Sequence, residues 1–171
     1  MAAVLVLNAG SSSIKFALYG LGPDGRGLSA RLSGQIDGLG TQPHIRARAA
    51  DGKPLDDIDL SLPGGVESQH REALRLLVAW LEGHGDGEPV VAAGHRVVHG
   101  GERFDAPALV TPELLEALTA FVPLAPLHQP HNLAAIRALA AAYPGLPQVA
   151  CFDTAFHRGQ PRVAQLFGLP R

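Results

Sequence analysis

The chain of 171 residues contains a single cysteine, Cys151, so it forms no disulfide bond within itself. A low cysteine content is typical of proteins in a reducing compartment, and we expect a cytoplasmic protein. Basic residues are not in excess, because 14 Lys and Arg stand against 16 Asp and Glu, for a formal net charge of -2. A protein that binds the nucleic-acid backbone needs a basic surplus. The composition therefore argues against a nucleic-acid partner.

Long apolar runs are also missing. No stretch approaches the roughly 20 residues that a helix needs to cross a bilayer, so we expect no membrane-spanning segment. The first ten residues lack the basic region and the cleavage site of a secretory signal peptide. Hydrophobic residues nevertheless make up 46% of the chain, which is enough to build a core, and the length predicts one domain.

Apolar runs and turn residues predict an α/β fold. Apolar runs at 3–7 and 14–19, joined by the turn 8–13, predict that a β-hairpin opens the chain. Further strands are predicted at 28–36, 44–49, 90–93 with an extension to 101, and 148–152. Helices are predicted over 66–81, over 111–121, and from 131 or 132 to 143. Three segments are predicted to lack a regular helix or strand, namely the polar excursion 50–65, the proline-rich stretch 123–130 and the tail 158–171.

The turn of the opening hairpin, from Asn8 to Lys15, is rich in small and polar residues. Gly10 allows the backbone to approach a ligand closely, and the successive N–H groups of a tight turn can form an anion-binding nest. Ser11 and Ser13 add hydroxyl donors, Lys15 adds a cation, and Asn8 adds a neutral contact for a metal or phosphate. An ordinary serine-rich hairpin is the alternative. The segment is not a Walker A loop, because that motif is absent and no helix follows.

A second polar segment, 95–102, combines two histidines, an arginine and two glycines. In an extended conformation His95, Val97 and His99 share one face, and Arg96 points the opposite way. An arginine at a strand end suits a carboxylate or a phosphate, because its guanidinium binds two oxygens at once. The alternative is a structural arginine beside core histidines.

Two later segments also place polar groups near turns. His128 lies between prolines, in a loop that is typical of a site more than of a core. Asp153 follows the strand 148–152, at the carboxyl end where open α/β sheets bind ligands. Zinc binding by the histidines is disfavoured because their spacing lacks a metal motif, and a serine hydrolase is disfavoured because no G-x-S-x-G occurs. Cys151 has apolar neighbours within a strand and is predicted to be buried and inert.

Four segments, in order, resemble the N-terminal domain of the acetate and propionate kinase family, within the sugar kinase, actin and heat-shock ATPase superfamily. They read VLVLNAGSSSIKF, GHRVVHGGE, LAPLHQPHN and FDTAFH, and they extend from residue 4 to residue 157. The resemblance implies a ribonuclease-H-like, actin-like ATPase domain. In this α/β fold a mixed sheet with flanking helices is opened by a β-hairpin, whose turn is the first phosphate loop. It also implies that residues 1–171 form one N-terminal domain, without the second, nucleotide-binding domain.

The activity that the resemblance implies is magnesium-dependent phosphoryl transfer from ATP to acetate, giving ADP and acetyl phosphate. Propionate kinase, or a non-catalytic module that binds phosphate or carboxylate, are the alternatives. Asn8 is implied to contact Mg²⁺. The residues implied to bind the phosphates of ATP are Gly10, Ser11, Ser13 and Lys15.

The resemblance also gives roles around acetate. Arg96 would bind the carboxylate or the transferring phosphoryl group, and His128 would contact the phosphoryl group. Val98 and Leu127 would line the pocket for the methyl group. Asp153 would be the catalytic acid residue; because acetate is already ionised at neutral pH, we expect it to position magnesium or its waters and not to abstract a proton.

Members of the family are homodimers that continue into a second domain. That domain supplies a further histidine and arginine, a glycine-rich adenosine site and a magnesium-binding glutamate, and none of these motifs follows His157 in this sequence. The resemblance therefore implies a chain that is inactive alone. One local departure is visible, because the family's His-Asn-Pro is His128-Gln129-Pro130 in this chain.

Overall fold

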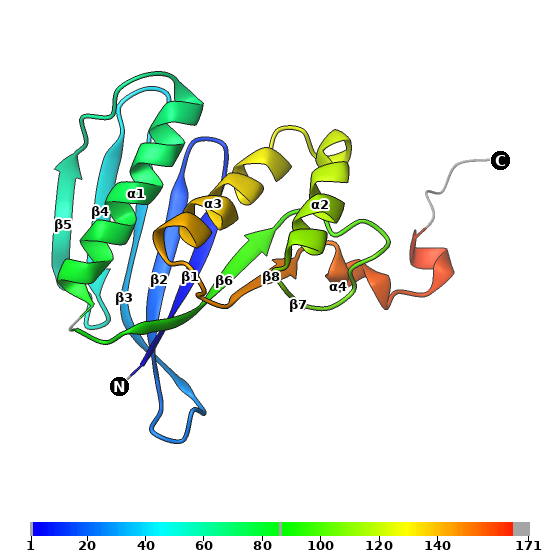
Figure 1. Cartoon of the computed structure of the whole chain (residues 1–171), viewed down its shortest axis with the longest axis horizontal. Helices are drawn as coiled ribbons and strands as arrows, with labels where there is room; N and C mark the ends of the chain where they lie inside the picture. Colours follow the sequence, from blue (N-terminus) through cyan, green and yellow to red (C-terminus); the bar gives the residue numbers. More distant parts are fainter. Residues whose placement is uncertain (1, 86, 166–171) are drawn as a thin grey trace.

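A computed structural model describes residues 2–85 and 87–165 of the chain. Within them, eight strands form one sheet in the order β5-β4-β3-β2-β1-β6-β8-β7 (Figure 1). The strands are β1 (Ala3–Ala9), β2 (Ile14–Leu21), β3 (Leu28–Asp37), β4 (His44–Ala49), β5 (Pro54–Asp59), β6 (Val90–Val97), β7 (Ala108–Leu109) and β8 (Gln148–Phe152). The helices are α1 (Val66–His84), α2 (Pro112–Ala120), α3 (Gln129–Ala142), α4 (Ala155–Arg158) and the short 3-10 helices η1 (Val122–Leu124) and η2 (Arg162–Gln165).

The sheet is mixed, as the family resemblance implies. Strands β1 to β5 form an antiparallel ribbon in which each strand pairs with the next along the chain. On the other side, β1, β6 and β8 run parallel, and the short β7 pairs with β8 in the antiparallel sense. The carboxyl ends of β1, β6 and β8 therefore meet at one edge of the sheet, where the chain leaves each strand.

Helices α1, α2 and α3 all cross the same face of the sheet (Figure 1). Under α1 and α3 the core consists of alternate residues of β1 to β4, and a second cluster fills the space between β6, β8, α2 and α3. In β1, for example, Leu5 and Leu7 are buried on the helical face, whereas Val6 points the opposite way and is 39% exposed. This alternation defines two faces, the helical face and an open face.

Two elements correct the sequence predictions. Residues 54–59, predicted as part of a surface excursion, form the edge strand β5. Its mostly exposed, acidic sequence gives no burial signal, and the strand is held by its pairing with β4. Helix α3 begins at Gln129, inside the proline-rich stretch that was predicted to be irregular. Pro130 is tolerated there because the N–H of a residue in the first helical turn has no partner within the helix.

The prediction for Cys151 is also wrong, because this residue is exposed. Its neighbours Ala150 and Phe152 point to the helical face and are buried, so Cys151 points to the open face. Apolar neighbours in a sequence do not reveal which face of a sheet is covered. In the tail, the structure shows the short η2, and residues 166–171 lie outside the described part.

Candidate active site

Four of the predicted site residues form a row across the open face, at the carboxyl ends of the parallel strands. Lys15 of β2 lies directly opposite Asn8 of β1 in the register. Arg96 lies near the end of the next strand, β6, and Asp153 follows β8. We call Lys15, Asn8, Arg96 and Asp153 the polar row. The sequence predicted each of them separately, and the fold brings them together.

Arg96 and Asp153 form the centre of the polar row. Nε of Arg96 donates to both carboxylate oxygens of Asp153 at 3.0 Å, and Nη2 donates to Oδ2 at 2.6 Å. Nη1 donates to Oδ1 of Asn8 at 3.3 Å. The hydrogen bonds to Asp153 raise the pKa of Arg96 above its ordinary value. The two side chains are 51% and 39% exposed, so water screens the pair and its contribution to folding is small.

Buried side-chain amides fix the strand ends beneath this row. Asn132 of α3 accepts from the N–H of Val98 at 3.0 Å and donates to the carbonyl of Ala9 at 2.7 Å, so it links the ends of β6 and β1. Gln129 is fully buried and donates to the carbonyl of His99 at 3.1 Å. The departure from the family pattern at Gln129 therefore falls on a buried side chain that makes a hydrogen bond. The linking role of Asn132 has no signal in the sequence, because its two partners are distant along the chain.

The turn between β1 and β2 is held in place by hydrogen bonds to its carbonyl groups. The carbonyl of Ser13 accepts from the N–H of Gly10 at 2.8 Å, and that of Ser12 accepts from the N–H of Leu39 at 3.1 Å. The carbonyl of Ser11 accepts from Nε2 of His70 at 2.9 Å. Among the described residues, nothing accepts from the N–H groups of Ser11, Ser12 and Ser13. These amides are therefore available to an external acceptor.

His70 is a residue that the sequence analysis missed. It lies on the buried side of α1 and is 2% exposed, a placement that sequence alone attributes to the core. Its ring stacks on that of His131 with centroids 4.6 Å apart. Partial burial and the neighbouring His70 lower the pKa of His131. His70 thus supports the turn between β1 and β2 from the helical side, and His131 packs against His70.

Two predicted site residues, Leu127 and His128, lie on the exposed loop before α3. Leu127 is 72% exposed and His128, which precedes α3, is exposed as well. In the part of the chain that the structure describes, neither contacts the polar row through a hydrogen bond or ion pair. Val98 is half-buried and is held near α3 by Asn132. Hydrogen bonds therefore join Arg96, Asp153 and Asn8, with Lys15 beside Asn8 in the register, and none of those described includes His128.

His95 is a core residue. It is 2% exposed, and its Nε2 lies 2.7 Å from Oε1 of Gln148. Burial lowers its pKa from 6.5 to about 4, so the ring is neutral near pH 7. Within residues 2–85 and 87–165, no group of three or more His, Cys, Asp or Glu side chains could hold a metal ion by itself. No helix among them is long and apolar enough to cross a membrane.

A mixed sheet that opens with a β-hairpin and carries polar residues at the carboxyl ends of its parallel strands has the α/β architecture of the actin-like ATPases. Comparison with known sequences is more specific, because the profile of the acetokinase family matches residues 3–171. The chain belongs to the acetokinase family.

Curated relatives include the acetate kinases of Rhodopseudomonas palustris CGA009, 50% identical over 168 residues, and of Deinococcus radiodurans, 48% identical over 172 residues. These alignments cover 98% and 97% of this chain but only 41% and 39% of those proteins. Two solved structures are similar over nearly the whole chain. The acetate kinase of Porphyromonas gingivalis has a TM-score of 0.84 at 32% identity, and the propionate kinase of Francisella tularensis has a TM-score of 0.80 at 35% identity. The chain covers 42% and 41% of these two structures.

Proposed function

We propose that this chain provides one wall of an acetate kinase site, which transfers a phosphoryl group between ATP and acetate. The observation that carries the proposal is the polar row, in which Arg96 is held at the centre of the open strand ends. The chain spans about two fifths of its curated relatives. We propose that sequence corresponding to their remaining part forms the opposite wall, with the adenosine site.

Arg96 is the group that would bind the acetate carboxylate or the transferring phosphoryl group. Phosphoryl transfer depends mainly on alignment and on neutralising charge at the transferring oxygens. The carboxylate of Asp153 orients the guanidinium through Nε and Nη2, and Nη1 has only the longer contact to Asn8. An anionic oxygen of the substrate would compete best at Nη1. Acetate needs no general base, because it is ionised at neutral pH.

The turn 10–13 is proposed to hold phosphate oxygens with its available amides, and Lys15 is proposed to add a cation beside them. A Cβ built on Gly10 would lie 3.6 Å from the nearest atom, the carbonyl oxygen of Ser13, which is an ordinary contact. The chain itself therefore has room for a side chain at this position. A glycine here leaves that space to a ligand. The hydroxyls of Ser11 and Ser13 would be further donors to phosphate.

Asn8 and Asp153 would hold the Mg²⁺ that ATP-dependent transfer calls for. Their amide and carboxylate oxygens are the hard donors that this ion prefers, and Mg²⁺ usually takes only one or two protein groups together with water and phosphate oxygens. The donor set therefore fits a site completed by nucleotide and water. When bound, the ion would neutralise phosphate charge. Asp153 would act through water or through the oxygen lone pairs that Arg96 leaves open.

The carboxylate substrate is proposed to be acetate or propionate. Val98 and Leu127 are proposed to contact its alkyl group and His128 the phosphoryl group, once the second wall covers their exposed loop. One methylene alters discrimination by only about 1–3 kcal/mol, so both substrates belong in the test. The similarity to a solved propionate kinase at 35% identity supports including it.

A hydroxamate assay for acyl phosphate tests the proposal. We would incubate the chain with magnesium-ATP and either acetate or propionate, alone and together with the part of the R. palustris acetate kinase that this chain does not match. We expect product only in the mixture. Product with the chain alone would contradict the two-wall proposal. No product in either case, with the two parts shown to associate, would favour a module that binds without catalysis.

In the active mixture, Asp153→Asn separates two roles of this carboxylate. If Asp153 positions magnesium, the variant should need a much higher magnesium concentration, about tenfold or more, with an unchanged pH profile. A loss that no magnesium concentration alters, with a displaced pH profile, would contradict this role. Asp24→Asn, an exposed change in the turn between β2 and β3, at the opposite end of β2 from Lys15, is the matched control.

A further inference from the structure

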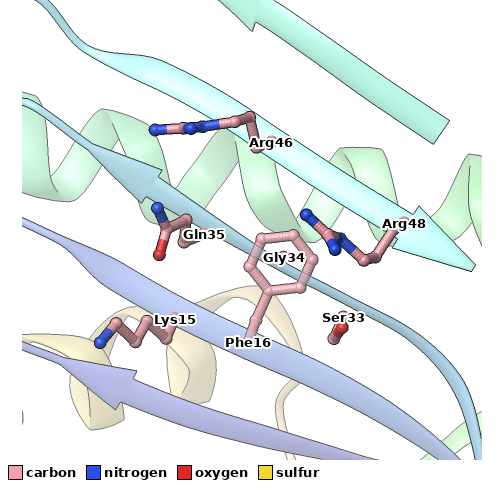
Figure 2. Close-up of a pocket in the computed structure, with 7 residues that line it drawn as sticks. All are labelled: Lys15, Phe16, Ser33, Gly34, Gln35, Arg46 and Arg48. Carbon is pink, nitrogen blue, oxygen red and sulfur yellow. The ribbon is translucent and has the colours of Figure 1, made fainter. Parts of the chain in front are cut away.

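A hollow on the open face lies beside the polar row, over the antiparallel ribbon. It has a volume of about 380 Å³ and is lined mainly by the outward side chains of β2, β3 and β4 (Figure 2). In the register, Lys15 lies opposite Gln35, which lies opposite Arg46. Ser33 and Arg48 form the next row. Between these rows lies the backbone of Gly34, where a side chain would point to the helical face toward Phe16 and Ala47, so no side chain rises between the rows on the open face.

The charges around this hollow do not cancel. Arg46 pairs with Asp37 at 3.0 Å, and Gln35 donates to the same carboxylate at 2.7 Å. Asp57, opposite Arg46 on β5, is bound to His44 at 2.6 Å. Lys15 and Arg48 have no ion-pair partner among the described residues. Two unpaired cations therefore face one opening.

We propose that this hollow, which we call the groove, binds a phosphate-class oxyanion with at least two negative charges. The groove is formed by Lys15, Ser33, Gln35, Arg46 and Arg48. Arg48 offers a planar fork of donors that matches two phosphate oxygens, and Lys15 offers a point charge. Ser33 adds a hydroxyl on the same face. The volume equals that of about a dozen waters, at roughly 30 Å³ each, which is room for two linked phosphate groups.

Lys15 belongs both to the groove and to the polar row, so binding at one site should affect binding at the other. Lys15 lies between them, opposite Asn8 on one side and Gln35 on the other. An oxyanion in the groove would draw the Lys15 ammonium away from phosphates at the turn 10–13 and would therefore inhibit their binding. This consequence rests on the proposed function, whereas binding in the groove does not.

Amide spectra of the ¹⁵N-labelled chain test the inference, because the two sites report on different residues. We would titrate inorganic phosphate, pyrophosphate and, at the same ionic strength, potassium chloride. Saturable shifts at 33–35 and 46–48 with both phosphates but not with chloride are expected, tighter for pyrophosphate. Arg48→Gln should weaken binding in the groove about fivefold, Arg48→Lys should restore part of it, and Arg71→Gln on the helical face should leave it unchanged.

Three results would overturn the inference: no shifts at 33–35 and 46–48, equal shifts with chloride, or unchanged affinity in Arg48→Gln with the wild-type spectrum otherwise retained. Shifts at 10–13 alone would overturn the groove and support the proposed function. Shifts in the groove alone would support the groove and contradict phosphate binding by the turn 10–13. If both appear, Arg48→Gln should abolish the competition while the turn still binds.

Discussion

The two sides of the sheet are held together in different ways. On the parallel side, buried amides such as Asn132 join strand ends that are far apart in the sequence. On the antiparallel side, neighbouring strands are joined by exposed ion pairs such as Arg46–Asp37. Water screens the exposed pairs, whereas a buried hydrogen bond leaves two unpaired groups when it is lost. The candidate active site lies at the carboxyl edge of the parallel side, where the buried amide of Asn132 holds the backbone at the ends of β1 and β6.

The largest expected effect comes from Asn132→Ala, on the parallel side. Removing this amide leaves the N–H of Val98 and the carbonyl of Ala9 without their partner. We expect the free energy of unfolding to fall by about 4 kcal/mol, from two unsatisfied groups and a small cavity. Urea unfolding followed by circular dichroism measures it. Gln42→Ala, an exposed change, is the control, and equal effects of the two would break the comparison.

Acid should destabilise the parallel side through His95. Its pKa is about 4 when folded and 6.5 when unfolded, so between these values the unfolded chain binds the extra proton. Stability is unaffected above pH 6.5 and falls as the pH drops toward 4, by about 3 kcal/mol in total. In urea unfolding at several pH values, His95→Gln should show a shallower fall. An unchanged slope would show that His95 is not responsible.

One position on the antiparallel side should be as intolerant as the core. A Cβ on Gly34 would lie 2.5 Å from both the carbonyl oxygen of Arg46 and Cζ of Phe16. We expect Gly34→Ala to lower the free energy of unfolding by about 2 kcal/mol, which urea unfolding measures as a lower midpoint. Gly83→Ala is the matched control, because no atom lies within 4 Å of its added Cβ and alanine favours the helix. Two stabilised variants would contradict this account.

The smallest effect is expected at His44, whose ring nitrogens contact Asp57 at 2.6 Å and Asp59 at 2.7 Å. These hydrogen bonds, first that to Asp59, raise its pKa above 6.5. Its contribution to stability is therefore present below pH 6.5 and is lost as the pH rises through the folded pKa, the opposite sense to His95. His44→Gln should destabilise slightly at pH 5.5 and not at pH 8.5. A loss that is equal at both pH values would mean that protonation has no part.

Local patterns predicted much of this fold. The opening hairpin, the strand that ends before Asp153 and the helix that begins after Thr111 follow from alternation and capping residues. Thr111 does accept from the N–H of Leu114 as an N-cap. The acidic strand β5 was not predicted, because its pairing with β4 and not its own sequence makes it a strand.

The candidate site was predictable residue by residue but not as an arrangement. Arg96 and Asp153 were found from their places at strand ends, and their direct contact depends on β6 and β8 being neighbours. His70 was not predicted as a site residue, because a histidine on the apolar stripe of a helix is typical of a core. His128 was found from its flanking prolines, and the hydrogen bonds described for the polar row do not include it.

Both outer strands of the sheet have a consequence for how the chain behaves at high concentration. An unpaired strand edge is a template on which another chain can add its own strand. At one edge, β5 begins with Pro54 and presents the carboxylates of Asp57 and Asp59 to solvent. At the other, β7 has only two residues, Ala108–Leu109, and follows Pro107. Charge repulsion at one end and brevity at the other therefore oppose growth of the sheet from molecule to molecule, which protects the chain against fibrous aggregation.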